Sequence, residues 1–241
     1  MEKTEAIVLH CCKYGDNKIF VNTFTRSNGR MTFAAVIPSS KNKASALPYC
    51  QPLFINEIEY SGSNRAEMRR ASRIAPSVTF STIPFSMAKT SVAMFLAEML
   101  SRVLSLSEEN EKIYDFIATS LKILDQPEFS GLNFHIKFLV QLAKYLGFYP
   151  GNRYSDSKPS FDIAKSMFVE DSAASIHQIR PPYGQIFSRI IDTDFLGCEE
   201  MELSGAGRSY LLEKIIEYYA YRFDNMANIR SLEVLKSVFH Q

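Results

Sequence analysis

The chain has 241 residues, which is enough for one large domain or two small ones. Its composition, with 46% hydrophobic and 22% charged residues, is that of a soluble globular protein. No apolar run reaches the roughly 20 residues of a membrane-spanning helix. Residues 1–5 lack the features of a secretory signal, so we expect a cytoplasmic protein with no membrane partner. The 4 cysteines are too few and too irregular for a disulfide framework.

The formal net charge of +1 is unevenly distributed along the chain. Residues 1–80 hold 11 Lys and Arg against 6 Asp and Glu, a net charge of +5, whereas the remainder holds 16 basic and 20 acidic residues, a net charge of −4. This asymmetry suggests that the first third of the chain meets a polyanion. The alternative is the chance imbalance that small domains often carry.

The first eighty residues have the pattern of short strands joined by turns. Asn28-Gly29 is the strongest hairpin signal, since both residues tolerate positive φ. The segment 69–75 is ambiguous, because its arginines share a face in either a helix or a strand. The strands are predicted at residues 4–10, 18–25, 30–37 and 53–60, with 69–75 as the fifth. Five short strands fit a small barrel of the oligonucleotide-binding (OB) type.

From Ser86 onward the apolar residues recur with a helical period. A polar stretch at 151–182 interrupts this pattern, and Phe161 and Phe168 within it predict a short hairpin or clip. Helices are predicted at residues 86–106, 108–124, 132–146, 183–193, 208–223 and 231–239. The predicted fold is therefore α+β with two domains: a five-stranded OB-fold β-barrel at residues 1–80 and an all-α helical domain at residues 81–241.

Signatures of enzymatic chemistry are weak in this sequence. The segment 205–209 lacks P-loop spacing, and its glycines indicate a loop before the helix at Arg208. The histidines have no spacing typical of metal ligands, and Cys11 and Cys12 point to opposite faces of a strand. Asp192 and Asp194, with Glu199 and Glu200, form either a solvated acidic loop, which we favour, or a divalent-metal site. We expect no enzyme, no cofactor, no metal and no small-molecule substrate.

An OB barrel with basic loops is suited to binding single strands, because Lys and Arg neutralise phosphates while aromatic rings stack on bases. The aromatic candidates for stacking are Tyr14, Phe20, Phe24 and Phe33, although Phe20, Phe24 and Phe33 are expected chiefly in the barrel core. Turn positions are expected to face solvent, which favours Arg26 and Arg30. The predicted DNA-binding residues are Arg26, Arg30, Lys41, Lys43, Arg65, Arg69, Arg70 and Arg73.

Several short motifs, in this order and spacing, resemble the bacterial recombination mediator family RecO. They are Thr4-Glu5-Ala6-Ile7-Val8-Leu9, Tyr14-Gly15-Asp16, Gln51-Pro52-Leu53, Phe95-Leu96-Ala97-Glu98-Met99-Leu100 and Tyr145-Leu146-Gly147-Phe148-Tyr149-Pro150. The resemblance implies an OB domain on a helical domain, binding of single- and double-stranded DNA, and annealing of complementary strands. It also implies that the protein works with the partner RecR and helps the recombinase RecA replace single-strand-binding protein (SSB) on gapped DNA, in association with the nucleoid.

Two further implications of the resemblance concern the helical part. Members of the family recognise the acidic C-terminal tail of SSB there, and cations beside apolar stripes are weak candidates for that contact: Arg102, Lys122, Lys137, Lys144 and Arg153. Many relatives also hold a four-cysteine zinc site after the segment that matches Gly147-Phe148-Tyr149-Pro150. Residues 151–182 contain no cysteine here, so we expect a zinc-less variant whose clip is held by packing.

Three other interpretations stay open on the sequence alone. The first is a metal-dependent nuclease that uses Asp192 and Asp194. The second is an OB-fold RNA-binding module. The third is an interaction scaffold with an incidental basic barrel and no affinity for nucleic acids.

Overall fold

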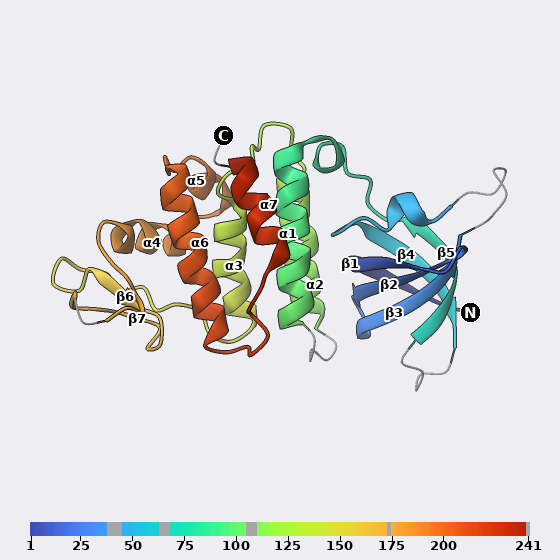
Figure 1. Cartoon of the computed structure of the whole chain (residues 1–241), viewed down its shortest axis with the longest axis horizontal. Helices are drawn as coiled ribbons and strands as arrows, with labels where there is room; N and C mark the ends of the chain where they lie inside the picture. The colour runs from blue at the N-terminus through green and yellow to red at the C-terminus, as the bar shows by residue number, and fades with distance from the viewer. Residues whose placement is uncertain (38–44, 63–67, 105–109, 173–174, 240–241) are drawn as a thin grey trace. The chain divides into compact units, whose positions relative to one another are not determined.

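A computed structural model describes residues 1–37, 45–62, 68–104, 110–172 and 175–239 of the chain. They form two compact units, Met1–Pro127 and Glu128–Gln241. The first unit opens with a closed five-stranded barrel, in which the strands neighbour one another in the order β1-β2-β3-β5-β4 (Figure 1). The strands are β1 (Glu2–Tyr14), β2 (Lys18–Thr25), β3 (Gly29–Val36), β4 (Ile55–Ser61) and β5 (Met68–Pro76).

The barrel is antiparallel except between β3 and β5. These two strands are parallel, and among the described residues they pair over Thr32–Ala34 with Met68–Arg70. Side chains alternate between the barrel core and the outside, as the strand period requires. Along β2, for example, Ile19 and Val21 are buried while Phe20 is half-buried on the outer face. The expectation of a core position was therefore wrong for Phe20, whereas Phe24 and Phe33 are buried as expected. This alternation assigns the residues of each cross-strand row to one face.

The predicted β2–β3 hairpin is confirmed, and its turn is held by a side chain. Gly29 adopts a φ of 62°, which suits glycine. The Thr25 hydroxyl accepts a hydrogen bond from the Asn28 N–H at 3.1 Å and donates one to the Gly29 carbonyl at 2.8 Å. The segment 69–75, which the sequence left ambiguous, is a strand. β4 begins at Ile55 rather than at Leu53, because Leu53 has a φ of 63° that a strand does not allow.

The helical part of the first unit follows two short 3₁₀ turns, η1 (Leu47–Tyr49) and η2 (Ile83–Phe85). Helix α1 (Met87–Val103) begins at the Ser86 cap, and α2 (Glu111–Leu124) begins at the Asn110 cap. The second unit contains α3 (Phe134–Tyr145), α4 (Tyr183–Asp192), α5 (Phe195–Glu199), α6 (Gly205–Ala220) and α7 (Arg230–Phe239), with the short strands β6 (Ser160–Asp162), β7 (Met167–Val169) and β8 (Gln178–Ile179). The fold class predicted from the sequence, a barrel followed by helices, is confirmed.

Two local expectations were wrong or incomplete. Gly205 and Gly207 lie inside the first turn of α6, not in a loop, because the Ser204 hydroxyl caps the Gly207 N–H at 3.1 Å. A side chain at Gly207 would bring its Cβ to 3.1 Å from the Tyr183 ring. Helix α5 and strand β8 were not predicted, because five and two residues are too short to show a period.

The link between the barrel and the helices of the first unit is held by Asp125. Its carboxylate accepts hydrogen bonds from the backbone N–H groups of Ser81, Thr82 and Ile83 at 2.7, 2.8 and 2.9 Å. Burial raises the pKa of this carboxyl group, but the backbone bonds and the Ser81 hydroxyl outweigh it, so the pKa lies below its ordinary value of 3.8. The ionised carboxylate thus fixes the segment that precedes η2.

Replacement of this carboxylate tests its role in the first unit. Asp125→Asn should lower the free energy of unfolding by about 2 kcal/mol, because an amide offers fewer acceptor sites to three N–H donors. Since the folded pKa is depressed, the contribution is complete above pH 3.8 and is lost as the pH falls through the lower folded value. Urea unfolding at neutral pH and in acid measures both effects. Asp115→Asn, at a carboxylate 54% exposed, is the matched control, and an equal loss there would contradict the assignment.

Candidate nucleic-acid interface

The outer face of the barrel presents an aromatic pair. Tyr14 is 63% exposed, and its ring centroid lies 5.1 Å from that of Phe20. Phe20 lies opposite Ala34 on β3, and Ala34 lies opposite Arg70 on β5, so this cross-strand row faces outward. Lys18 lies opposite Val36 in the next outward row. We call the surface formed by Tyr14, Lys18, Phe20, Val36 and Arg70 the aromatic face.

A groove adjoins the aromatic face where β3 and β5 separate. Beyond their short parallel pairing, the two strands leave an opening of about 780 Å³ that Val36, Tyr49, Arg70 and Arg73 help to line. We call it the basic groove. Arg70 and Arg73 are exposed, and Arg73 also pairs with Glu59 at 3.5 Å. Cations, the groups that neutralise phosphates, and aromatic rings, the groups that stack on bases, therefore lie together at one side of the barrel.

The remaining predicted DNA-binding residues divide into two groups. Lys41, Lys43 and Arg65 lie outside the described residues. Ser45, the first described residue after Lys43, lines the basic groove. Arg69 turns from the outer face: its guanidinium lies 5.3 Å from the Tyr60 ring centroid and contacts the Met31 sulfur at 3.5 Å.

Arg26 and Arg30 contact the helices of their own unit. Arg26 forms an exposed ion pair with Asp115 of α2 at 3.2 Å. Arg30 donates a hydrogen bond to the Ser101 carbonyl in the last turn of α1 at 2.7 Å, and burial lowers the pKa of its guanidinium. The expectation that turn positions face solvent was therefore wrong for Arg30, because this end of the barrel packs on α1. Contact of either arginine with phosphate stays a prediction.

The environment of Arg30 predicts a structural effect. Arg30→Ala should lower the free energy of unfolding by about 1 to 2 kcal/mol, since it removes a cation that caps carbonyl groups at a helix C-terminus. Arg26→Ala should cost less than about 1 kcal/mol, because it removes only an exposed ion pair. Chemical denaturation of both variants measures the difference. Equal stabilities, with a reduced salt dependence of DNA binding in Arg30→Ala, would instead assign Arg30 to the DNA surface.

The weak candidates for SSB-tail binding lie in both units. Arg102 and Lys122 belong to the first unit, and Arg102 pairs with Glu98 at 2.6 Å. Lys137 is fully buried, and its ammonium group donates to the carbonyls of Ile190 and Ile191 at 2.9 and 3.2 Å. It caps the end of α4 and is not a surface cation. Lys144 and Arg153 are exposed in the second unit.

Two of the four acidic residues considered for a metal site accept hydrogen bonds from backbone groups near helix N-termini. Asp194 caps α5 by accepting a hydrogen bond from the Gly197 N–H at 2.8 Å. Glu199 accepts bonds from the N–H groups of Gly131, Leu132 and Asn133 at 2.6, 3.2 and 3.3 Å, just before α3. Asp192 and Glu200 are exposed. Within the described ranges, no three His, Cys, Asp or Glu side chains are grouped so that they could hold a metal ion.

The predicted clip is present in the second unit as a small sheet of β6, β7 and β8. Phe161 and Phe168 are buried, with ring centroids 5.3 Å apart. The Phe161 ring also packs on Phe187 of α4 and Tyr218 of α6. As predicted for a segment without cysteines, aromatic packing forms the core of this element.

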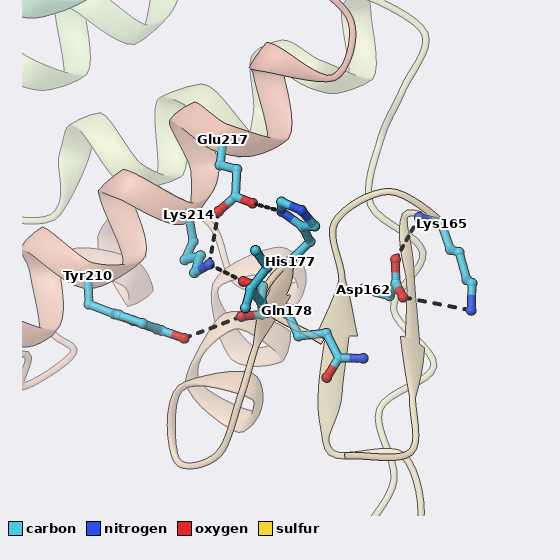
Figure 2. A network of polar contacts seen from close by, with 8 residues as sticks. Asp162, Lys165, His177, Gln178, Tyr210, Lys214 and Glu217 are labelled. Carbon is cyan, nitrogen blue, oxygen red and sulfur yellow. Dashed lines mark hydrogen bonds and ion pairs between the residues drawn. The ribbon is translucent and has the colours of Figure 1, made fainter. Parts of the chain in front are cut away.

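Polar contacts fix the edges of the clip (Figure 2). Glu217 of α6 contacts the Nδ1 of His177 at 2.5 Å and the Nζ of Lys214 at 2.9 Å, and Lys214 also donates to the Ile176 carbonyl at 2.8 Å. The Tyr210 hydroxyl of the same helix donates to the Gln178 carbonyl at 3.4 Å. These contacts attach the strand β8 and the residues before it to α6.

Asp171 and Arg180 close the other side of the clip. The Arg180 Nε and Nη2 each lie 2.7 Å from a different oxygen of the Asp171 carboxylate, and the Ser160 hydroxyl donates to the same carboxylate at 2.7 Å. The bonds from Arg180 and then Ser160 lower the pKa of Asp171 from 3.8 to about 2. The segment after β7 is thereby joined to β6 and to the residue that follows β8.

The Asp171 contacts predict how the clip responds to acid and to chelators. Asp171→Asn should lower the melting temperature at neutral pH, and the difference from the parent should vanish as the pH falls from about 4 towards 2, where the parent carboxylate also becomes protonated. EDTA should leave the melting temperature of the parent unchanged, since no cysteine is available in residues 151–182. Asp156→Asn, at an exposed residue, is the control. A chelator-induced fall would contradict this account.

The barrel topology and the outward aromatic and cationic residues define a class, that of OB-fold proteins that bind nucleic acid. Residues 1–79 match the family model "Recombination protein O N terminal", and residues 84–154 match "Recombination protein O C terminal". Similar proteins named "DNA repair protein RecO" occur in Flavobacterium psychrophilum (32% identical, covering 98% of each chain) and Phocaeicola vulgatus (30%, 99% of each).

A third relative with that name, from Flavobacterium johnsoniae, is 32% identical over 98% of each chain. The chain belongs to the RecO family of DNA repair proteins. The resemblance noted in the sequence is thereby confirmed. No helix among the described residues is long and apolar enough to cross a membrane.

Proposed function

We propose that this DNA repair protein is a non-enzymatic recombination mediator. It binds single- and double-stranded DNA, anneals complementary strands and, with RecR, helps to load RecA onto single-stranded DNA coated with SSB. It acts in the cytoplasm, at the nucleoid. The observation that supports this proposal best is the aromatic face, which places the Tyr14–Phe20 ring pair and Arg70 beside the basic groove.

Annealing of this kind needs no covalent step. Two DNA strands repel each other through their phosphates, and a cationic surface that holds both reduces the repulsion and raises their effective concentration. Arg70 and Arg73, and the predicted Lys41 and Lys43, supply positive charge, while Phe20 and Tyr14 offer stacking surfaces that tolerate any base. Base pairing then supplies the driving force.

The proposed partners make different demands on the surface. The acidic SSB tail needs a lysine or arginine beside an apolar cleft, and Lys122, Lys144 and Arg153 keep exposed side chains that meet the first requirement. The proposal that the protein works with RecR rests on membership of the family.

Single substitutions on the aromatic face test the proposal. Arg70→Ala should weaken binding of a single-stranded oligonucleotide several-fold and reduce the slope of log K against log salt by about 0.7, because one phosphate contact is lost. Phe20→Ala should weaken binding about fivefold or more with the slope unchanged, since it removes stacking and no charge. Fluorescence anisotropy over a salt series measures both effects. Annealing of SSB-coated complementary strands should slow in both variants.

Arg189→Ala, which removes an exposed arginine in the second unit that has no proposed role in binding, is the matched control for charge. Unchanged affinity and salt slope in the folded Arg70→Ala variant would remove the aromatic face from the DNA surface. Stronger binding to RNA of the same sequence would favour an RNA-binding module. Mg²⁺-dependent cleavage that Asp192→Asn abolishes would favour the nuclease.

A further inference from the structure

A second groove in the first unit is mostly apolar. It measures about 880 Å³ and lies between η1, the segment from Pro76 to Phe85, and α1. Its walls include the rings of Tyr49, Phe54 and Phe80, and none of the residues that line it is charged. Phe85 stands at its border with 84% of its surface exposed. We call it the apolar groove.

The apolar groove adjoins two pockets that carry cationic residues. Tyr49 and Pro76 line both this groove and the basic groove, which carries Arg70 and Arg73. On another side, Gln51 and Pro52 are shared with a smaller pocket of about 250 Å³ that His10 and Lys13 line. Positive charge therefore borders the apolar groove at two places, while its own lining carries none.

We infer that the apolar groove receives the unpaired bases of a single DNA strand that continues from the basic groove. This inference rests on the proposed function and adds the path that a single DNA strand takes over the first unit. Phosphates are held by the cations of the two adjoining pockets, Arg70 and Arg73 in one and Lys13 in the other. The bases between them lie on the exposed rings of Tyr49, which is 37% exposed, and Phe85.

Charge complementarity favours this occupant over a protein segment. A peptide with an apolar anchor needs only one cation beside the groove. A DNA strand carries a phosphate at every nucleotide and can therefore use the cations of both adjoining pockets. A duplex does not fit, because its bases are stacked within it and cannot reach the rings. The apolar groove should therefore bind single strands and contribute little to duplex binding.

The lack of tryptophan in the chain allows a direct test at Phe85. Phe85→Trp keeps an aromatic platform and introduces a single fluorophore. Titration with oligo(dT) should quench its emission and saturate at the same concentration as the anisotropy of a labelled strand. Ile176→Trp, at a residue 76% exposed in the second unit, is the matched reporter and should not be quenched.

Phe85→Ala completes the test. Because the Phe85 side chain is highly exposed, its truncation removes little buried packing and leaves the fold intact. It should weaken single-strand binding about fivefold or more, leave duplex binding unchanged and leave the salt slope unchanged. If the tryptophan at position 85 is not quenched while anisotropy shows binding, or if its emission responds only to RecR or SSB, the inference is overturned and the proposed function stands. If the parent protein binds no DNA, both fail.

Discussion

The short parallel pairing of β3 with β5 is the constraint on which the rest of the first unit depends. It joins Thr32–Ala34 to Met68–Arg70 and closes the barrel around its apolar core. Because it ends after these residues, the strands separate and leave the basic groove beside Arg70. The same register aligns Arg70 with Ala34 and Phe20 on the outer face. Closure of the barrel and the position of its cations thus have one cause.

The cations of the barrel differ in what they bind, and the sequence could not assign their roles. In the sequence, a basic residue beside a turn looks the same whether its side chain faces solvent or contacts a helix formed by a later part of the chain. Arg30 meets the last turn of α1, and Arg69 meets the Tyr60 ring. Arg70 differs from Arg69 by one position, and in a strand this reverses the face. The composition of the first third therefore shows a net positive charge, but the register is needed to tell which arginines lie on the outer face.

Most elements were predictable where local chemistry decides them. The Asn28-Gly29 turn and the apolar periods of α1 to α4 depend on neighbours in the sequence. The clip shows the opposite case: β6 and β8 span three and two residues and cannot be stable alone. They persist because Phe161 packs on α4 and α6, and because Glu217 and Arg180 bind residues distant in the sequence. No local pattern reports such contacts.

If the proposed function and the inferred strand path hold, the basic groove binds DNA through charge and the apolar groove binds it through stacking. Arg70 and Arg73 interact with phosphates whether a strand is paired or not, so on this proposal the basic groove acts on both forms of DNA. The rings of the apolar groove reach only unpaired bases, so they add affinity for single strands alone. When a complementary strand pairs with the bound strand, the bases of the bound strand leave the rings, while its phosphates stay in contact with the cations. The protein then holds the duplex more weakly than the strand, which favours release after annealing.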